Sequence, residues 1–169
     1  MTLPLRRRAT ARLLLVDPGD RVLFLQDSDP GAPGATWWLT PGGGVDPGET
    51  LADAAVREAA EETGLLLDAD AVGHVVLTRD VRHTYSDIVV EQREDFFLVR
   101  VHAFTPHHAG FTVDEQATVL GSRWWPLADL ASTADDVWPR GIGALLPRLL
   151  AGEGPIALPF SYEDPRVPA

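Results

Sequence analysis

The segment from about Thr50 to Thr63 constrains the fold of this chain more than any other. It follows a glycine-rich turn, stops at Gly64, and carries small and apolar residues at helical spacing along one side. We therefore expect a helix here, with that side facing a core. The residues of this side are Ala52, Val56, Ala59 and Thr63.

Short apolar segments on both sides of this helix have the length of β-strands. They cover about residues 10–16, 21–26, 37–39, 72–79, 88–91, 95–104 and 119–125. Pro18-Gly19-Asp20 predicts a hairpin between the first two, and residues 27–36, rich in turn formers, predict a mobile loop. Further helices are expected at 126–130 and about 136–151. Strands mixed with separated helices predict an α/β fold whose sheet is covered on both faces.

The length of 169 residues fits one domain, which we assign to residues 1–152, followed by a proline-rich tail over 153–169. No apolar run is long enough to cross a membrane. The apolar stretch that follows Arg6-Arg7-Arg8 is too short for the core of a signal peptide. We therefore expect a cytoplasmic protein. The absence of cysteine excludes disulfides, thiolate metal sites and cysteine nucleophiles.

The net charge of -11 limits the partners of the chain. Polynucleotide binding uses Lys and Arg to displace counterions, so an acidic chain is a poor general binder of nucleic-acid backbones. A phosphate substrate stays compatible with this charge if divalent cations lie between the acids and the phosphates. The composition therefore favours a metal-using enzyme over a nucleic-acid platform.

Three glutamates of the helix fall within one arc of its surface. Helical spacing places Glu58, Glu61 and Glu62 close together, with Arg57 between the acids Asp53 and Glu61. Their charges repel one another, and the C-terminal turns of a helix disfavour negative charge. A magnesium ion, which prefers oxygen ligands, would compensate for both effects. The alternative is a solvated acidic face without a ligand.

The turn Thr40-Pro41-Gly42-Gly43-Gly44 precedes the helix and has few side chains to block a close approach. Its backbone is suited to meeting a phosphate or to offering a carbonyl to a metal. No Gly-Lys-Ser/Thr follows, so it is not a Walker A loop.

Taken together, these residues resemble a known motif. Gly43, five residues, Glu49, seven residues and then Arg57-Glu58-Ala59-Ala60-Glu61-Glu62-Thr63-Gly64-Leu65 resemble the Nudix box at every fixed position. At Ala59 the family usually has a larger aliphatic residue. The similarity extends over roughly residues 8–150. It implies a Nudix-type α/β/α sandwich with a mixed sheet.

The resemblance also implies an activity. Nudix enzymes hydrolyse a diphosphate linkage in a nucleoside diphosphate derivative, using metal-activated water and Mg²⁺, with Mn²⁺ as an alternative. The substrate would be a nucleoside triphosphate, a sugar nucleotide, ADP-ribose or a dinucleoside polyphosphate. By motif position, the metal would be held by Glu58, Glu61, Glu62 and the carbonyl of Gly42. Arg57 would orient the glutamates, and Gly43 and Glu49 would support the site.

Residues outside the box are further candidates for the site. Glu115, on the segment between two predicted strands, is our candidate for an extra metal ligand or general base, the alternative being an ordinary loop acid. The candidates for substrate binding are Trp38, Arg79, Arg82 and Tyr85, since tyrosine can stack on a base and arginines can bind phosphates. Each of these is alternatively a surface or packing residue.

Three other functions are alternatives to hydrolysis of a small nucleotide. A non-catalytic Nudix-like nucleotide sensor or regulatory module is the main alternative, although such relatives typically lose box glutamates that this chain keeps. An isomerase of the isopentenyl diphosphate type needs a catalytic cysteine. Removal of pyrophosphate from an RNA 5′ end is less attractive for an acidic chain. A small nucleotide is thus the expected partner. Homodimers are common in the family, but the sequence does not fix an oligomeric state.

Overall fold

The computed structural model describes residues 3–164; residues 1–2 and the expected end of the tail, 165–169, lie outside this range. One mixed sheet has the strand order β3-β2-β1-β6-β5-β8, with β4 beside β1, β7 beside β2 and β9 beside β5. The strands are β1 Leu5–Val16, β2 Arg21–Ser28, β3 Thr36–Leu39, β4 Gly42–Gly44, β5 Val75–Tyr85, β6 Ile88–Arg100, β7 Gly121–Pro126, β8 Ile156–Ala157 and β9 Ser161–Glu163. The helices are α1 Leu51–Thr63, α2 Ala69–Val72, α3 Val113–Thr118, α4 Leu127–Ser132 and α5 Ile142–Leu150.

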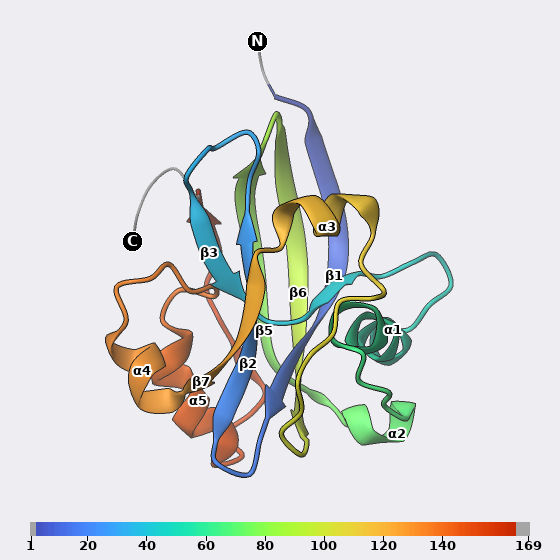
Figure 1. Cartoon of the computed structure of the whole chain (residues 1–169), viewed down its shortest axis with the longest axis vertical. Helices are drawn as coiled ribbons and strands as arrows, with labels where there is room; N and C mark the ends of the chain where they lie inside the picture. Colours follow the sequence, from blue (N-terminus) through green and yellow to red (C-terminus); the bar gives the residue numbers. More distant parts are fainter. Residues whose placement is uncertain (1–2, 165–169) are drawn as a thin grey trace.

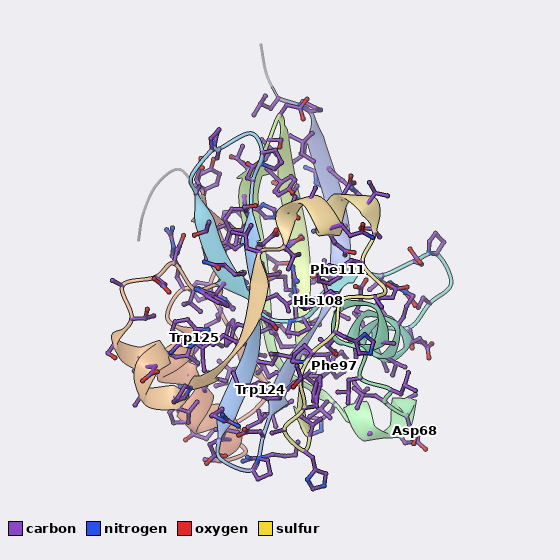
Figure 2. All side chains as sticks on the ribbon, viewed as in Figure 1. Asp68, Phe97, His108, Phe111, Trp124 and Trp125 are labelled. Carbon is purple, nitrogen blue, oxygen red and sulfur yellow. The ribbon has the colours of Figure 1, made fainter. Side chains whose placement is uncertain are left out.

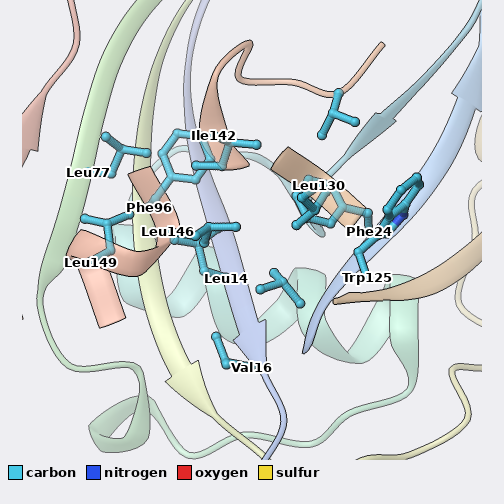
Figure 3. Packing of buried hydrophobic residues seen from close by; sticks show 12 residues of the cluster. Leu14, Val16, Phe24, Leu77, Phe96, Trp125, Leu130, Ile142, Leu146 and Leu149 are labelled. Carbon is cyan, nitrogen blue, oxygen red and sulfur yellow. The ribbon is translucent and has the colours of Figure 1, made fainter. Parts of the chain in front are cut away.

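The sheet lies between two groups of helices, α1 and α2 on one side and α4 and α5 on the other (Figure 1). Alternate residues of β1 point to opposite faces of the sheet. Leu13 and Leu15 pack in the cluster that contains the buried alanines of α1. Leu14 and Val16 pack in the cluster of α4, α5 and Trp125 (Figure 3). The predicted α/β/α sandwich with a mixed sheet is confirmed.

Helix α1 lies where it was predicted. The Thr50 side chain caps its first turn by accepting a hydrogen bond from the Asp53 amide at 3.1 Å. The helix ends at Gly64, whose φ of 76° gives a left-handed cap. Its buried face differs from the expected one. Ala54 and Ala55 are buried together with Ala59, whereas Ala52 and Val56 are only partly buried.

Several other elements differ from the prediction. Residues 88–91 and 95–104 were expected as two strands, but β6 continues from Ile88 to Arg100. The glycine turn contains strand β4, and α3 lies in a segment expected to be a loop. The last helix begins at Ile142 rather than near residue 136. The hairpin at residues 18–20 is confirmed by the antiparallel pairing of Val16 with Val22.

The segment expected to be an extended tail adds to the edge of the sheet. Strands β8 and β9 both pair in parallel with β5. Within this segment, Glu163 is buried and forms an ion pair with Arg79 of β5 at 2.7 Å. No helix in residues 3–164 has both the length and the apolar character needed to span a membrane.

Candidate active site

Strand β4 brings the backbone of the glycine turn against the carboxylates of α1. The Gly42 amide donates to Glu62 Oε2 at 2.7 Å, and the Gly42 carbonyl accepts from Arg12 Nη1 at 2.6 Å. A Cβ at Gly42 would lie 2.1 Å from the Ala11 carbonyl oxygen, and one at Gly43 only 2.4 Å from Glu58 Oε1. The absence of a side chain lets the backbone of β1 pack closely against Gly42 and the Glu58 carboxylate of α1 approach Gly43.

Arg57 joins the turn to the helix glutamates. Its Nε donates to Glu49 at 2.9 Å, its Nη2 to the Gly44 carbonyl at 2.8 Å, and its Nη1 to both Glu58 at 2.7 Å and Glu61 at 3.1 Å. Hydrogen bonding from Arg57 lowers the pKa of Glu49 and, reciprocally, raises that of Arg57. The expected contact of Arg57 with Asp53 is not made, because the Asp53 carboxylate accepts from Thr50 instead.

Three carboxylates from two helices converge on one point. Oxygens of Glu58, Glu62 and Glu115 all lie within 4.8 Å of one another. Burial raises the pKa of Glu62 well above its usual value, and the nearby Glu58 raises it further. Burial also raises the pKa of Glu58, against the hydrogen bond from Arg57. Two buried acids and a partly buried one this close together, with oxygen atoms as the donor set, fit a hard divalent cation. Glu61 lies outside this group, with 43% of its side chain exposed.

Glu115 reaches the site because α3 is tied to the end of α1. His108 Nδ1 hydrogen-bonds the Glu62 carbonyl at 2.9 Å, and its ring stacks on Phe111 at 4.4 Å (Figure 2). Thr112 then holds Glu115 Oε2 through its amide at 2.7 Å and its hydroxyl at 2.8 Å. The acid expected on a loop therefore lies on a short helix that points it at the α1 glutamates.

A cleft of about 250 Å³ opens beside these carboxylates. Its floor is the polar face of β1, β5 and β6, and its walls come from α3, β3 and the Trp138 loop. The lining residues from β1 are Arg6, Arg8 and Arg12, and those from β5 are Arg79, His83 and Tyr85. Trp37 and Trp138 stack on each other at 5.0 Å and form an aromatic wall. The cleft thus offers cationic, aromatic and acidic groups to a ligand.

The proposed substrate residues divide into two groups. Arg79 and Tyr85 line the cleft, whereas Trp38 and Arg82 do not. Trp38 instead packs edge-on against Trp125, with Nε1 donating to Asp135 at 3.1 Å. Arg82 is ion-paired with Glu91 on the opposite face of the sheet from Arg79. Each lies one or three residues along its strand from a residue that lines the cleft, and successive side chains of a strand point to opposite faces.

The sequence did not predict that arginines of β1 and Trp138 of the aromatic wall would line the cleft. The run Arg6-Arg7-Arg8 was interpreted only as resembling the basic part of a signal peptide, and Arg12 was given no role. Their even spacing was the available signal, since it places them on one face of a strand. Trp138 comes to the cleft from far along the chain. His83 packs beside it, and burial lowers the pKa of His83 to about 4.

Two named hydrolases are similar to this chain in sequence. The RNA pyrophosphohydrolase of Psychrobacter cryohalolentis is 28% identical over 160 residues, covering 87% of this chain and 88% of the relative. The nucleoside triphosphatase NudI of Enterobacter sp. is 35% identical over 96 residues, covering 56% of this chain and 67% of the relative.

Solved structures show the same fold. The MutT protein of Methanosarcina mazei Go1 superimposes with a TM-score of 0.61 at 20% identity, covering 89% of this chain and 98% of that one. The C. elegans Ap4A hydrolase binary complex gives a TM-score of 0.52 at 21% identity, covering 86% and 96%. The sequence model of the NUDIX domain family matches residues 6–146 of this chain. The chain therefore belongs to the Nudix hydrolase family.

Proposed function

We propose that this protein hydrolyses a diphosphate linkage in a nucleoside diphosphate derivative and depends on Mg²⁺, with Mn²⁺ as an alternative. The observation that carries this proposal is the convergence of Glu58, Glu62 and Glu115 within 4.8 Å at the edge of a cleft with arginines on its floor. A solvated acidic helix face does not account for it, because Glu58 and Glu62 are each only 6% exposed.

The residues that would hold the cation are Glu58, Glu62 and Glu115. Glu61 lies outside the group but shares Arg57 Nη1 with Glu58, and it would serve as a further ligand. The Gly42 carbonyl keeps one lone pair beside the hydrogen bond from Arg12, so it can also serve. When bound, a divalent cation neutralises phosphate oxygens and lowers the pKa of water.

The side chains around this position would orient and deprotonate the attacking water. Thr112 fixes Glu115 Oε2, and Glu115 Oε1 has no hydrogen-bond partner in residues 3–164. That oxygen would accept the proton of the water. The water oxygen would bond to phosphorus while the bond to the leaving phosphate breaks. Arg57 would hold Glu58 and Glu61 in place throughout.

Two sources of the diphosphate are considered, a small nucleotide and an RNA 5′ end. The net charge of -11 favours the small nucleotide. The RNA end is a second candidate, because the relatives named RNA pyrophosphohydrolase match over most of this chain. The sensor alternative is disfavoured by the intact and convergent glutamates. A homodimer stays a prediction.

The experiment that tests the proposal is a hydrolysis panel with Mg²⁺ and with chelator. It would contain nucleoside triphosphates, sugar nucleotides, ADP-ribose, diadenosine polyphosphates and a 5′-triphosphorylated oligoribonucleotide, with products separated by chromatography. Glu62→Gln should lower kcat by a factor on the order of 10³ and leave the fold intact, since it removes one carboxylate of the group. Glu153→Gln, which removes an exposed acid paired with Arg148, is the control. Nucleotide binding without hydrolysis of any compound would favour the sensor.

A further inference from the structure

Within residues 3–164, almost every arginine is paired with a carboxylate, and the exceptions lie together. The sequence has no lysine, so its 14 basic residues are all arginines, against 25 acids. Among the described residues, only Arg6 and Arg8 have no carboxylate within 4.0 Å; every other arginine there has one. In so acidic a protein, two neighbouring cations without carboxylate partners need an explanation.

Both arginines face the cleft. They lie two residues apart on β1, on the same face as Arg12, and all three line the cavity. Arg8 is half-buried, and its Nε donates to Gln92 at 2.9 Å. Its two terminal amino groups have no hydrogen-bond partner in residues 3–164. Burial, together with the charges of Arg12 and Arg6, lowers the pKa of Arg8 to about 10, so it stays protonated at neutral pH.

The other two arginines of the cleft floor already have carboxylate partners within the protein. Arg12 is ion-paired with Glu94 at 3.1 Å. Arg79 is ion-paired with Glu94 and, at 2.7 Å, with Glu163. Their charge is therefore compensated within the protein. Among the described residues that line the cleft, only Arg6 and Arg8 are arginines without a carboxylate within 4.0 Å, and the acidic residues Asp114 and Glu115 of α3 line the same cleft.

Arg8 is near enough to the carboxylate group to interact with it electrostatically. Glu58 lies within electrostatic range of Arg8. A diphosphate at the cleavage point would be neutralised by the cation that the carboxylates hold, which leaves the two free guanidinium groups for another anion. A guanidinium binds phosphate oxygens through paired N–H groups, and such charge-assisted bonds are strong.

We propose that Arg6 and Arg8 form a phosphate subsite, so that the substrate carries at least one phosphate besides the two joined by the cleaved linkage. This inference rests on the proposed function and narrows it. Nucleoside triphosphates, dinucleoside polyphosphates and 5′-triphosphorylated RNA have such a phosphate. ADP-ribose and sugar nucleotides do not.

Kinetics of matched arginine variants test the subsite. Arg8→Gln should raise KM for a nucleoside triphosphate about tenfold or more with kcat nearly unchanged, the effect of losing one charged hydrogen bond. Arg8→Lys, which keeps the charge, should recover part of the affinity. Arg7→Gln is the control, because Arg7 lies between the two on the other face of β1, exposed and paired with Glu91. Equal effects of Arg7→Gln and Arg8→Gln, or preference of the wild type for ADP-ribose, would overturn the proposal.

A binding measurement separates the subsite from the activity. Inorganic tripolyphosphate would be titrated calorimetrically into the Glu62→Gln protein with Mg²⁺, with and without Arg8→Gln or Arg7→Gln. We expect about tenfold weaker binding only with Arg8→Gln. If this difference is found but no compound in the hydrolysis panel is cleaved, the subsite stands and the proposed function fails. If Arg8→Gln leaves tripolyphosphate binding unchanged, the subsite is refuted whatever the panel shows.

Discussion

At the scale of single residues, Gly43 sets the place of the Glu58 carboxylate. An added Cβ would lie 2.4 Å from Glu58 Oε1, well inside contact distance, whereas at Gly44 it would meet nothing within 4 Å. We expect Gly43→Ala to displace the Glu58 carboxylate and lower kcat by a factor on the order of 10², as misplacement by about 1 Å does. Gly44→Ala should change kcat less than about twofold. Steady-state kinetics on both variants checks this.

The same pair of variants separates a local effect from unfolding. Both glycines lie on β4 and neither has a left-handed φ, so alanine strains the backbone at neither. Urea denaturation should therefore give similar stabilities for the two proteins. If Gly43→Ala keeps full activity, then contact with Gly43 does not position Glu58.

The box residues were the part of the site that the sequence could predict. Fixed spacing along one helix determines which glutamates share a face, so Glu58 and Glu62 could be found without coordinates. Trp37 and Trp38 show the limit, because two adjacent tryptophans give no signal for which one faces the cleft. Arg8 shows another limit. The absence of a carboxylate partner is a property of the folded chain, and no local pattern encodes it.

At the scale of elements, two capping boxes of the same kind have different consequences. Thr50 with Asp53 caps α1, and Thr112 with Glu115 caps α3. In α3 the capping acid is also a member of the carboxylate group. We expect Thr112→Ala to lower kcat about tenfold by releasing Glu115, and Thr50→Ala to cost about 1 kcal/mol of stability with little change in kcat. Urea denaturation and kinetics on both variants measure this.

The positioning role of Thr112 would be contradicted if Thr112→Ala changed only the stability and Thr50→Ala lowered kcat. If Thr112→Ala only destabilises the protein, Glu115 is held by other means or takes no part in the reaction. Thr112→Ser, which keeps the hydroxyl, should restore the activity that alanine removes, since the hydroxyl and amide both bond Glu115 Oε2.

Elements with apolar patterns were predicted better than polar ones. The prediction divides β6 in two because Gln92, Arg93 and Glu94 interrupt its apolar residues. In the fold Glu94 is buried between Arg12 and Arg79, so ion pairs take the place of apolar contacts in the middle of the sheet. Helix α3 has only six residues and a mostly polar sequence, and it forms because its caps and the contacts of the preceding loop with α1 hold it.

At the scale of the whole molecule, the cleft floor is a polar layer inside an otherwise apolar sandwich, and it makes stability depend on pH. His83 is 9% exposed, packs against Trp138, and has its pKa lowered to about 4, first by burial and then by Arg8. A buried imidazole of this kind is neutral in the folded state and gains a proton more readily on unfolding. Its contribution to stability is therefore full above pH 6.5 and is lost as the pH falls from 6.5 toward 4.

The size of this loss follows from the shift in the pKa of His83 from 6.5 to about 4. It corresponds to about 3 kcal/mol of unfolding free energy at most, at 1.36 kcal/mol per unit. We expect His83→Gln to reduce the difference in stability between pH 7 and pH 4.5 by about 2 kcal/mol, measured by urea denaturation. His74→Gln, at an exposed histidine, should leave that difference unchanged. An equal pH dependence in wild type and His83→Gln would mean that His83 is not buried neutral in the cleft, and the polar floor would then owe its acid sensitivity to its carboxylates alone.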